Sequence, residues 1–313
     1  MPFSAIADVY TFEKVPRILN INYMNDDYIH NKIGPLAKFV AYLRTFSDIP
    51  YSLEIADMAR AERAFLQQFG KNRELIEWAA PVVEARYKAI DYILILYGIR
   101  NILEVAAGLS PRGLAFTEDA RTHYVETDLA DIIQQKEILA RKILQAKRTR
   151  GLNNLHFHPV NALVRGEIMT TLSFFDRSKK IAIVHDGLLP YLTVAERKVF
   201  AANVHAILSF HGGIWVHTDV SLKNRYRNLV AGNSKLRNAL FTISTIINRD
   251  VEDNAFEDEA DAEKFFKEAG FRITRWKLSK CVGGLASAAK LGVSDDKVGE
   301  LLDTTYVWIM EPR

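Results

Sequence analysis

The stretch that decides the fold is Asn101–Gly113, NILEVAAGLSPRG. Residues 102–105 are apolar apart from one acid and predict a short strand, which runs into a small-residue turn at Ala106, Ala107 and Gly108. A strand, a glycine turn and a helix in this order are typical of open α/β sheets, which bind nucleotides at the carboxyl ends of their strands. The turn must be tight and must let a ligand approach the backbone, and glycine allows both.

This turn lacks the motifs that hold a phosphate. Gly108 and Gly113 do not form G-x-G-x-x-G, and no Lys-Ser/Thr pair follows to make a P-loop. Glu104 lies inside the predicted strand, where an apolar residue is usual. An acid followed closely by small residues and a glycine suits a nucleoside that carries an amino acid and no phosphate. The stretch therefore indicates S-adenosylmethionine, although a glycine after a buried strand is also common as a plain turn.

From residue 102 onward, strand and helix patterns alternate, which predicts a parallel sheet. The predicted strands are Ile102–Val105, His123–Glu126, Leu155–Pro159, Lys180–His185, Gly213–Thr218, Arg272–Leu278 and Tyr306–Met310. The predicted crossover helices are Gly113–Ala120, Leu129–Thr149, Leu163–Phe175 and Val194–Phe210. The last two strands, separated by a loop, are expected to pair as an antiparallel edge. The fold class is thus α/β: a Rossmann-like, seven-stranded, mostly parallel sheet with an antiparallel last strand.

Residues 1–85 predict an N-terminal helical cap, and residues 86–313 predict the core. Tyr51–Phe69 and Arg73–Tyr97 carry apolar residues at helical spacing, and a glycine follows each where a C-cap belongs. Pro81 is expected to kink the second helix or to divide it in two.

A polar segment of the core, at about residues 221–259, contains no clear strand and predicts a lid-like insertion over the carboxyl ends of the sheet. Aromatic and aliphatic side chains are dense in it and suggest helices that close an apolar pocket. These side chains are Tyr226, Leu229, Leu236, Leu240, Phe241 and Ile246. The alternative is that they only pack the insertion onto the domain.

Composition narrows the class of protein. The chain has 313 residues, 49% of them hydrophobic, and a net charge of +3, which does not argue for a nucleic-acid partner. The single cysteine, Cys281, excludes an intrachain disulfide and a multi-cysteine zinc site, and no metal site is predicted. No secretory signal and no apolar run of roughly 18 residues is visible. We therefore expect a cytoplasmic protein with no membrane partner; the oligomeric state is left open.

Polar residues follow several predicted strands at their carboxyl ends. Asp128 ends the second strand about twenty residues after Gly108, the place where an acid binds the ribose hydroxyls in nucleotide-binding folds; it also suits a helix N-cap. Asn161 follows the third strand and is a candidate for the adenine edge or for a turn. The fourth strand ends in His185, Asp186 and Gly187.

Two histidines are candidates for a general base. His185 ends the fourth strand and His217 ends the fifth, with Asp219 two residues later. Each histidine is equally suited to a structural role, hydrogen-bonded in the core. No G-x-S-x-G elbow is present, so a hydrolase triad has little support.

With these stretches side by side, the chain resembles the leucine carboxyl methyltransferase family of S-adenosylmethionine-dependent O-methyltransferases, which includes bacterial enzymes acting on polyketide-type small molecules. The resemblance covers Arg86 to about Asp219. It rests on ARYKAIDYIL, LEVAAGLSPRG, HYVETDLADIIQQK and HDGLLPYLT. The chain departs from the family pattern at the glycine turn and just after it, at Asn161-Ala162 and at Asp186.

The resemblance implies roles for individual residues. Arg86 would hold the methionine carboxylate of S-adenosylmethionine, and Asp128 would bind the ribose. Asp186 would face the methionyl amino end. The remaining residues implied to line the cofactor are Glu104, Ala106, Gly108, Leu129, Asn161, Ala162 and Gly187.

The acceptor is left open between a carboxylate and a hydroxyl, on a small molecule or a peptide C-terminus. A carboxylate acceptor is ionised at neutral pH and needs no base, whereas a hydroxyl would need His185 or His217 as the catalytic base. Two other functions compete. One is an NAD(P)-dependent oxidoreductase, disfavoured by the bulky Leu109-Ser110-Pro111 at the turn. The other is a protein that binds S-adenosylmethionine without turnover.

Overall fold

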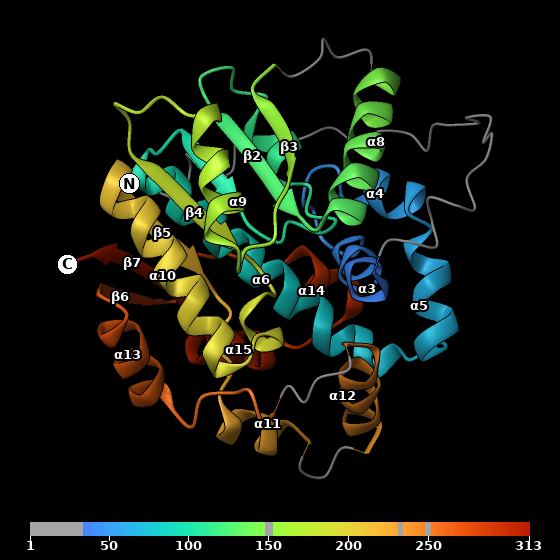
Figure 1. Ribbon diagram of the computed structural model, residues 1–313. Coiled ribbons are helices and arrows are strands. Elements are labelled where there is room, and N and C mark those ends of the chain that lie inside the picture. Colours follow the sequence, from blue (N-terminus) through green and yellow to red (C-terminus); the bar gives the residue numbers. More distant parts are fainter. Residues whose placement is uncertain (1–33, 148–152, 231–233, 248–251) are drawn as a thin grey trace.

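Seven strands form one mixed sheet at the centre of the molecule. The computed structural model describes residues 34–147, 153–230, 234–247 and 252–313 (Figure 1). The strands lie in the order β3-β2-β1-β4-β5-β7-β6. Only β7 runs antiparallel, against both of its neighbours, while the other pairs are parallel. The strands are β1 Asn101–Glu104, β2 His123–Asp128, β3 Leu155–Pro159, β4 Ile181–His185, β5 Gly213–His217, β6 Phe271–Lys277 and β7 Tyr306–Pro312.

The predicted fold class is confirmed, and each predicted strand agrees with the observed one to within two residues at either end. The position of the antiparallel strand adds a detail. β6 and β7 do pair, from Phe271 with Pro312 to Lys277 with Tyr306. The antiparallel strand itself is not the outer one, however: β7 lies between β5 and β6, and β6 forms the edge.

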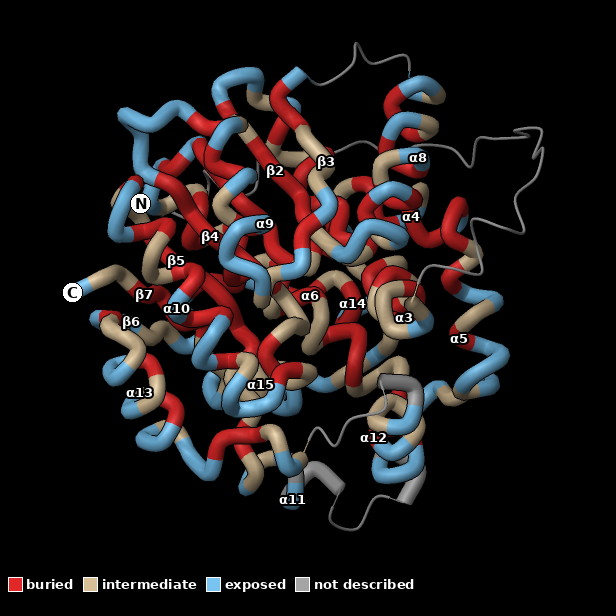
Figure 2. Tube along the Cα trace, viewed as in Figure 1, coloured by how far each residue is buried: buried red, intermediate tan, exposed pale blue. Residues whose placement is uncertain are grey.

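Helices cover both faces of the sheet, because successive side chains of a strand point to opposite faces. One face packs against α6 Arg73–Tyr97, α8 Ala130–Ala146, α14 Ala286–Leu291 and α15 Asp295–Thr304. The other packs against α9 Arg165–Thr170, α10 Val194–His211 and α13 Glu259–Glu268. The five inner strands are mostly buried, whereas most residues of the edge strands β3 and β6 are partly exposed or exposed (Figure 2). The short α7, Arg112–Phe116, follows the glycine turn.

The cap is built from α3 Pro35–Arg44, α4 Ser52–Met58, α5 Ala61–Phe69 and the first half of α6. The single helix predicted over residues 51–69 is therefore wrong: it breaks where Arg60 takes a left-handed backbone conformation, with φ of 52°. α6 is one helix with Pro81 inside it, capped by Asn72 and by Gly98. The boundary expected between residues 85 and 86 falls within α6, so cap and core share this helix.

The insertion predicted near residues 221–259 contains α11 Lys223–Val230 and α12 Ser234–Ile247. Its two ends meet, since the backbone of Phe256 bonds to Ser221 and Lys223. Leu240 packs with Phe39 and Leu43 of the cap, which joins α12 to α3. Phe241 is 72% exposed. The side chains of Tyr226, Leu229, Leu236 and Ile246 lie outside those that the structure describes.

The connection between β6 and β7 differs from the prediction. α14 and α15 fill the connection between β6 and β7, where the sequence suggested a loop. Among the described residues, no helix is long and apolar enough to cross a membrane.

Candidate functional site

The glycine turn after β1 has the shape that a tight turn requires. Ala106 and Gly108 both have positive φ angles, 53° and 49°. The turn is tied to the end of β2 by Asp128, whose carboxylate accepts hydrogen bonds from the backbone nitrogens of Gly108 and Leu129, each 2.8 Å long. Burial raises the pKa of Asp128, although both amide bonds oppose the shift. Asp128 thus lies beside the turn at the carboxyl ends of β1 and β2.

The cap helix α3 lies directly over this turn. A methyl group built on Gly108 would lie 3.6 Å from the Cβ atom of Ala37, within ordinary contact. At the end of the same helix, a nitrogen of the Arg44 guanidinium donates to the carbonyl oxygen of Leu109 across 3.4 Å. Helix α3 is therefore a wall of the candidate site.

Four charged side chains meet where β4 and β5 end, and we call them the strand-end cluster: Arg44, Arg86, Asp186 and Asp219. Arg86 pairs with Asp186 at 2.5 Å and also with Asp219, and its Nε donates to Thr218 at 2.9 Å. Arg44 lies 3.7 Å from the other oxygen of Asp186. Positive and negative groups alternate, so the cluster offers both an anion and a cation to a zwitterionic ligand.

Asp219 anchors the cluster. Its side chain is fully buried and accepts hydrogen bonds from the backbone nitrogens of Gly187 at 2.7 Å and Leu188 at 2.6 Å. His185 Nδ1 lies 2.8 Å from the same carboxylate. Burial by itself would raise the pKa of Asp219, but the bond to His185 and the charge of Arg86 outweigh it and hold the pKa well below its usual range. A carboxylate held this firmly fixes the loop after β4.

The two histidines proposed as general bases are not on an open surface. His185 and His217 are 0% exposed and stack on each other with ring centroids 4.7 Å apart. They lie on the α10 face of the sheet, against Trp215 and Phe266. Burial lowers the pKa of His217 well below its ordinary value, so its ring is neutral. Their burial favours the alternative, structural role, and the catalytic role stays a prediction.

Glu104 is placed away from the turn, in a buried network that we call the Arg112 network: Asp91, Glu104, Arg112 and Tyr124. Arg112 is 0% exposed and pairs with Glu104 and, at 2.6 Å, with Asp91. Tyr124 donates to the second oxygen of Glu104 at 2.8 Å. Burial opposes ionisation of Glu104, but Arg112 and Lys136 outweigh it and lower its pKa. Both carboxylate oxygens are in use, so Glu104 stabilises the turn rather than facing a ligand.

The candidates after β2 and β3 are exposed and locally bonded. Leu129 is 56% exposed. The side-chain oxygen of Asn161 accepts from the backbone nitrogen of Leu163 at 3.0 Å, the hydrogen bond of an Asx turn. The carbonyl of Ala162 accepts from Asn203 at 2.9 Å. Asn161 therefore makes the turn that was its alternative role, and the adenine contact stays a prediction.

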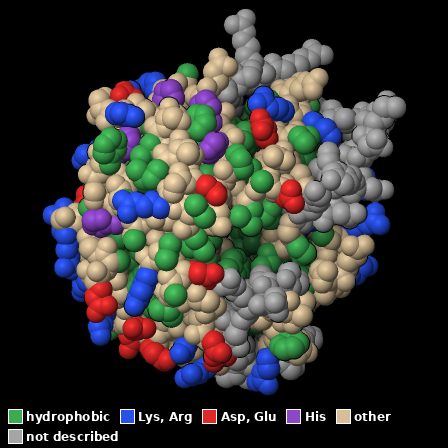
Figure 3. Space-filling view, in the orientation of Figure 1, with side chains coloured by type: hydrophobic (Ala, Val, Ile, Leu, Met, Phe, Trp, Pro, Cys, Tyr) green, Lys and Arg blue, Asp and Glu red, His purple; other side chains and the backbone are tan. Residues whose placement is uncertain are grey.

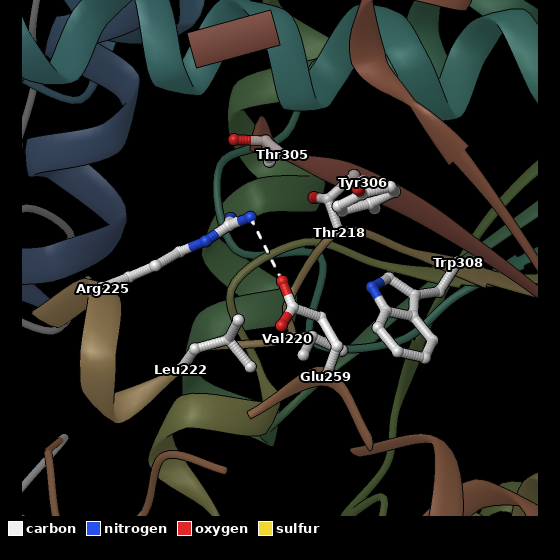
Figure 4. Close-up of a pocket in the computed structure, with 8 residues that line it drawn as sticks. All are labelled: Thr218, Val220, Leu222, Arg225, Glu259, Thr305, Tyr306 and Trp308. Atoms are coloured by element: carbon white, nitrogen blue, oxygen red, sulfur yellow. Dashed lines mark ion pairs between the residues drawn. The ribbon is translucent and has the colours of Figure 1, made fainter. Parts of the chain in front are cut away.

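A small pocket opens beside the strand-end cluster, between the ends of β5 and β7 and the insertion (Figure 4). Thr218, which binds Arg86, belongs to its wall. Arg225 and Glu259 face each other across it, 3.6 Å apart, and the indole nitrogen of Trp308 points toward it (Figure 4). The remaining lining residues are Val220, Leu222, Thr305 and Tyr306. In Figure 3, hydrophobic side chains gather around a hollow near the centre of the face in view.

Sequence reasoning missed three members of these groups as site residues. Arg44 lies in the cap, 42 positions before Arg86, and no local pattern relates the two. Asp219 was noticed at the end of the fifth strand but was given no role, although its place after β5 matches that of Asp186 after β4. Arg112 follows a proline at a helix start, a position where an arginine is ordinarily exposed.

Comparison with known proteins identifies a shared fold. No protein-family model matches the chain, and no curated protein matches it in sequence. A DUF574 family protein from Streptomyces avermitilis is similar in structure, with a TM-score of 0.58 and 14% identity over 91% of this chain and 100% of that one. Magnesium protoporphyrin IX methyltransferase from Synechocystis, solved with bound SAH, has a TM-score of 0.43 and 10% identity over 81% of this chain and 99% of that one. A putative O-methyltransferase from Nostoc punctiforme has a TM-score of 0.42 and 12% identity over 92% of this chain and 73% of that one.

The first of these similarities carries the structural conclusion. Its TM-score of 0.58 shows a common fold over nearly the whole of both chains, and at 14% identity it shows the fold alone. Together with the strand order and the antiparallel β7, it confirms the Rossmann-like, seven-stranded, mostly parallel fold. The other two similarities lie below a TM-score of 0.5 and add no argument.

Proposed function

We propose that this protein is an S-adenosylmethionine-dependent methyltransferase. The observation that carries the proposal is the link between the first two strand ends: Asp128, at the end of β2, accepts a hydrogen bond from the backbone of Gly108 in the turn after β1. In nucleotide-binding α/β folds an acid at that place receives the ribose hydroxyls. The absence of phosphate-binding glycines at the turn favours a nucleoside without phosphate over a dinucleotide.

The residues at the strand ends fit such a cofactor chemically. Each oxygen of Asp128 already accepts one amide bond at 2.8 Å, and a carboxylate oxygen retains a second acceptor site for a ribose hydroxyl. The strand-end cluster presents a carboxylate, Asp186, between two guanidinium groups. An amino-acid group carries one positive and one negative charge, so this alternation of charges complements it.

The chemistry asks little of the protein beyond placement. S-adenosylmethionine, when bound, supplies a methyl carbon already activated by its sulfonium, and the acceptor oxygen displaces the thioether in line. The chain's own contribution is to hold the two reactants in register and to exclude water. Asp128 and the strand-end cluster fix one reactant at both ends. α3 covers the turn from outside and excludes solvent from it.

We further propose that the acceptor is an oxygen nucleophile, on a small molecule or a peptide C-terminus, as the resemblance to the leucine carboxyl methyltransferase family implies. Since His185 and His217 are 0% exposed, a carboxylate acceptor, which needs no base, is favoured over a hydroxyl. The pocket of Figure 4 is next to the cluster, and its wall includes Arg225 in an ion pair with Glu259. Leu222, Arg225 and Glu259 come from the insertion, which keeps the insertion as the element proposed to select the substrate.

Calorimetric titration tests the proposal. S-adenosylhomocysteine is expected to bind the wild-type protein, and NADH is not. Replacement of Asp128 by alanine should weaken S-adenosylhomocysteine binding by about 1–3 kcal/mol, because a buried polar partner is left unmet. Asp131→Ala, an acid three residues further along in the first turn of α8, is the matched control. Binding of NADH without S-adenosylhomocysteine would instead support the oxidoreductase reading.

Turnover separates an enzyme from a binding protein. Methyl transfer from labelled S-adenosylmethionine should be measured with a panel of carboxylic acids, phenols and peptides ending in a free carboxylate. Transfer to carboxylic acids alone agrees with the proposal. Binding without transfer to any acceptor would identify a non-catalytic protein that keeps the fold and the cofactor.

A further inference from the structure

The cap contributes a buried arginine to the candidate site. Arg44 is the last residue of α3 and is 4% exposed. Its guanidinium lies over the ring of Tyr87, 5.4 Å from the centroid, with the backbone of Leu109 on one side and Asp186 on another. It therefore lies between the glycine turn and the end of β4, the two strand ends at which a cofactor would be held.

The hydrogen bonds of Arg44 are incomplete. A guanidinium has five N–H donors, and a buried one is costly unless they are used. Within the described part of the chain, Arg44 makes one bond of 3.4 Å to Leu109 and a 3.7 Å ion pair to Asp186, and its Nε is buried without a partner. Burial accordingly lowers the pKa of Arg44, against the opposing charge of Asp186.

Arg86 is the reverse case. Its Nε donates to Thr218 at 2.9 Å, and its Nη2 is shared by Asp186 and Asp219. Burial alone would lower the pKa of Arg86, but these two carboxylates outweigh it and raise the pKa. Its charge is therefore already balanced within the chain. Of the two arginines, Arg44 is the one whose surroundings call for another anion.

We propose that Arg44 holds the carboxylate of the cofactor's amino-acid end, and that Arg86 is a positioning residue that fixes Asp186 and Asp219. The inference rests on the proposed function and changes the residue that the family resemblance implied. A carboxylate beside Arg44 would use donors that are now unmet, and the planar fork of arginine suits two carboxylate oxygens. The neighbouring Asp186 then faces the ammonium group.

Two ligands that differ only at the amino-acid end give the test. S-adenosylhomocysteine carries the amino acid, and 5′-methylthioadenosine lacks it. We expect Arg44→Met to weaken S-adenosylhomocysteine binding on the order of 10–100-fold and to leave methylthioadenosine binding unchanged. Arg44→Lys, which keeps the charge but not the planar fork, should bind S-adenosylhomocysteine with an affinity between those of the wild type and Arg44→Met. Arg63→Met, on the exposed face of α5, is the matched control and should change neither.

Arg86→Lys separates the two arginines. Arg86 pairs with Asp186 and Asp219 in the ligand-free protein, so this change should lower the melting temperature without any ligand and, through Asp186, should weaken binding of the ligand that carries the amino acid. The proposal is overturned if Arg44→Met leaves S-adenosylhomocysteine binding intact or weakens both ligands equally, or if Arg86→Lys weakens S-adenosylhomocysteine binding without lowering the melting temperature of the ligand-free protein. If the wild-type protein binds neither ligand, the proposed function itself fails, and that result is visible before any variant is made.

Discussion

Replacing Arg112 by methionine removes the cation at the centre of the Arg112 network and keeps much of the side-chain volume. Arg112 is 0% exposed, contacts Glu104 and Asp91, and lies 4.1 Å above the ring of Tyr87. Its removal leaves two buried carboxylates without their cation. Breaking a buried ion pair in this way costs about 3–5 kcal/mol of the free energy of unfolding.

Urea unfolding at pH 7, followed by tryptophan fluorescence, measures that loss. The double variant Arg112→Met with Glu104→Gln should recover a good part of it, because the amide removes one of the two negative charges that Arg112 faces. The stability of Arg112→Met should also depend on pH. Without Arg112, burial raises the pKa of Glu104 in the folded state, so the folded variant binds a proton that the unfolded chain does not, and it regains stability as the pH falls.

The difference in the free energy of unfolding between the wild type and Arg112→Met should therefore become smaller from pH 7 to pH 5. A loss smaller than about 1 kcal/mol at pH 7, or a gap that stays constant with pH, would refute the role given to this network.

Three other predictions address stability and binding. Burial raises the pKa of Glu126, which lies 2.6 Å from Lys136, to about 7, so the folded state keeps a proton that the unfolded state loses. Between pH 5.5 and 7 the wild type should therefore lose about 2 kcal/mol of its free energy of unfolding relative to Glu126→Gln. Parallel pH profiles of the two proteins in urea unfolding would contradict this. Leu240→Ala should cost about 2 kcal/mol or more because Leu240 packs in the cap, whereas its exposed neighbour variant Phe241→Ala should stay within about 0.5 kcal/mol. Asp128→Asn, which keeps one acceptor oxygen, should lose less affinity for S-adenosylhomocysteine than Asp128→Ala, and equal losses would speak against direct contact.

The centre of the sheet could be predicted from the sequence because β1, β4 and β5 are short, mainly apolar runs followed by polar or small residues. The two helices between β6 and β7 could not. α14 is six residues long, and only Val298, Leu301 and Leu302 mark an apolar face on α15. The break between α4 and α5 was missed because the helical spacing continues across it. It depends on the backbone of Arg60, a residue type that gives no signal of a left-handed conformation.

The candidate site, too, could be predicted only in part. Asp128 and Asp186 could be found because strand ends are visible in sequence, and the carboxyl ends of parallel strands meet at one edge. What each charge pairs with is decided by packing between distant segments. Arg86 was predicted to face a ligand, yet the structure places it against two carboxylates of its own chain. Glu104 was predicted to line the cofactor, but its carboxylate forms an ion pair with Arg112, eight residues later.

The place of β7 has a consequence for the order of assembly. β7 supplies the hydrogen bonds that join β6 to β5, yet its residues are synthesised after those of all the other strands. A nascent chain that has emerged only as far as β6 therefore has an open edge on β5 and no template for β6. Such edges pair readily with other chains. We infer that the sheet closes only once residues 306–312 have left the ribosome, so the open edge of β5 needs protection throughout the synthesis of α14 and α15.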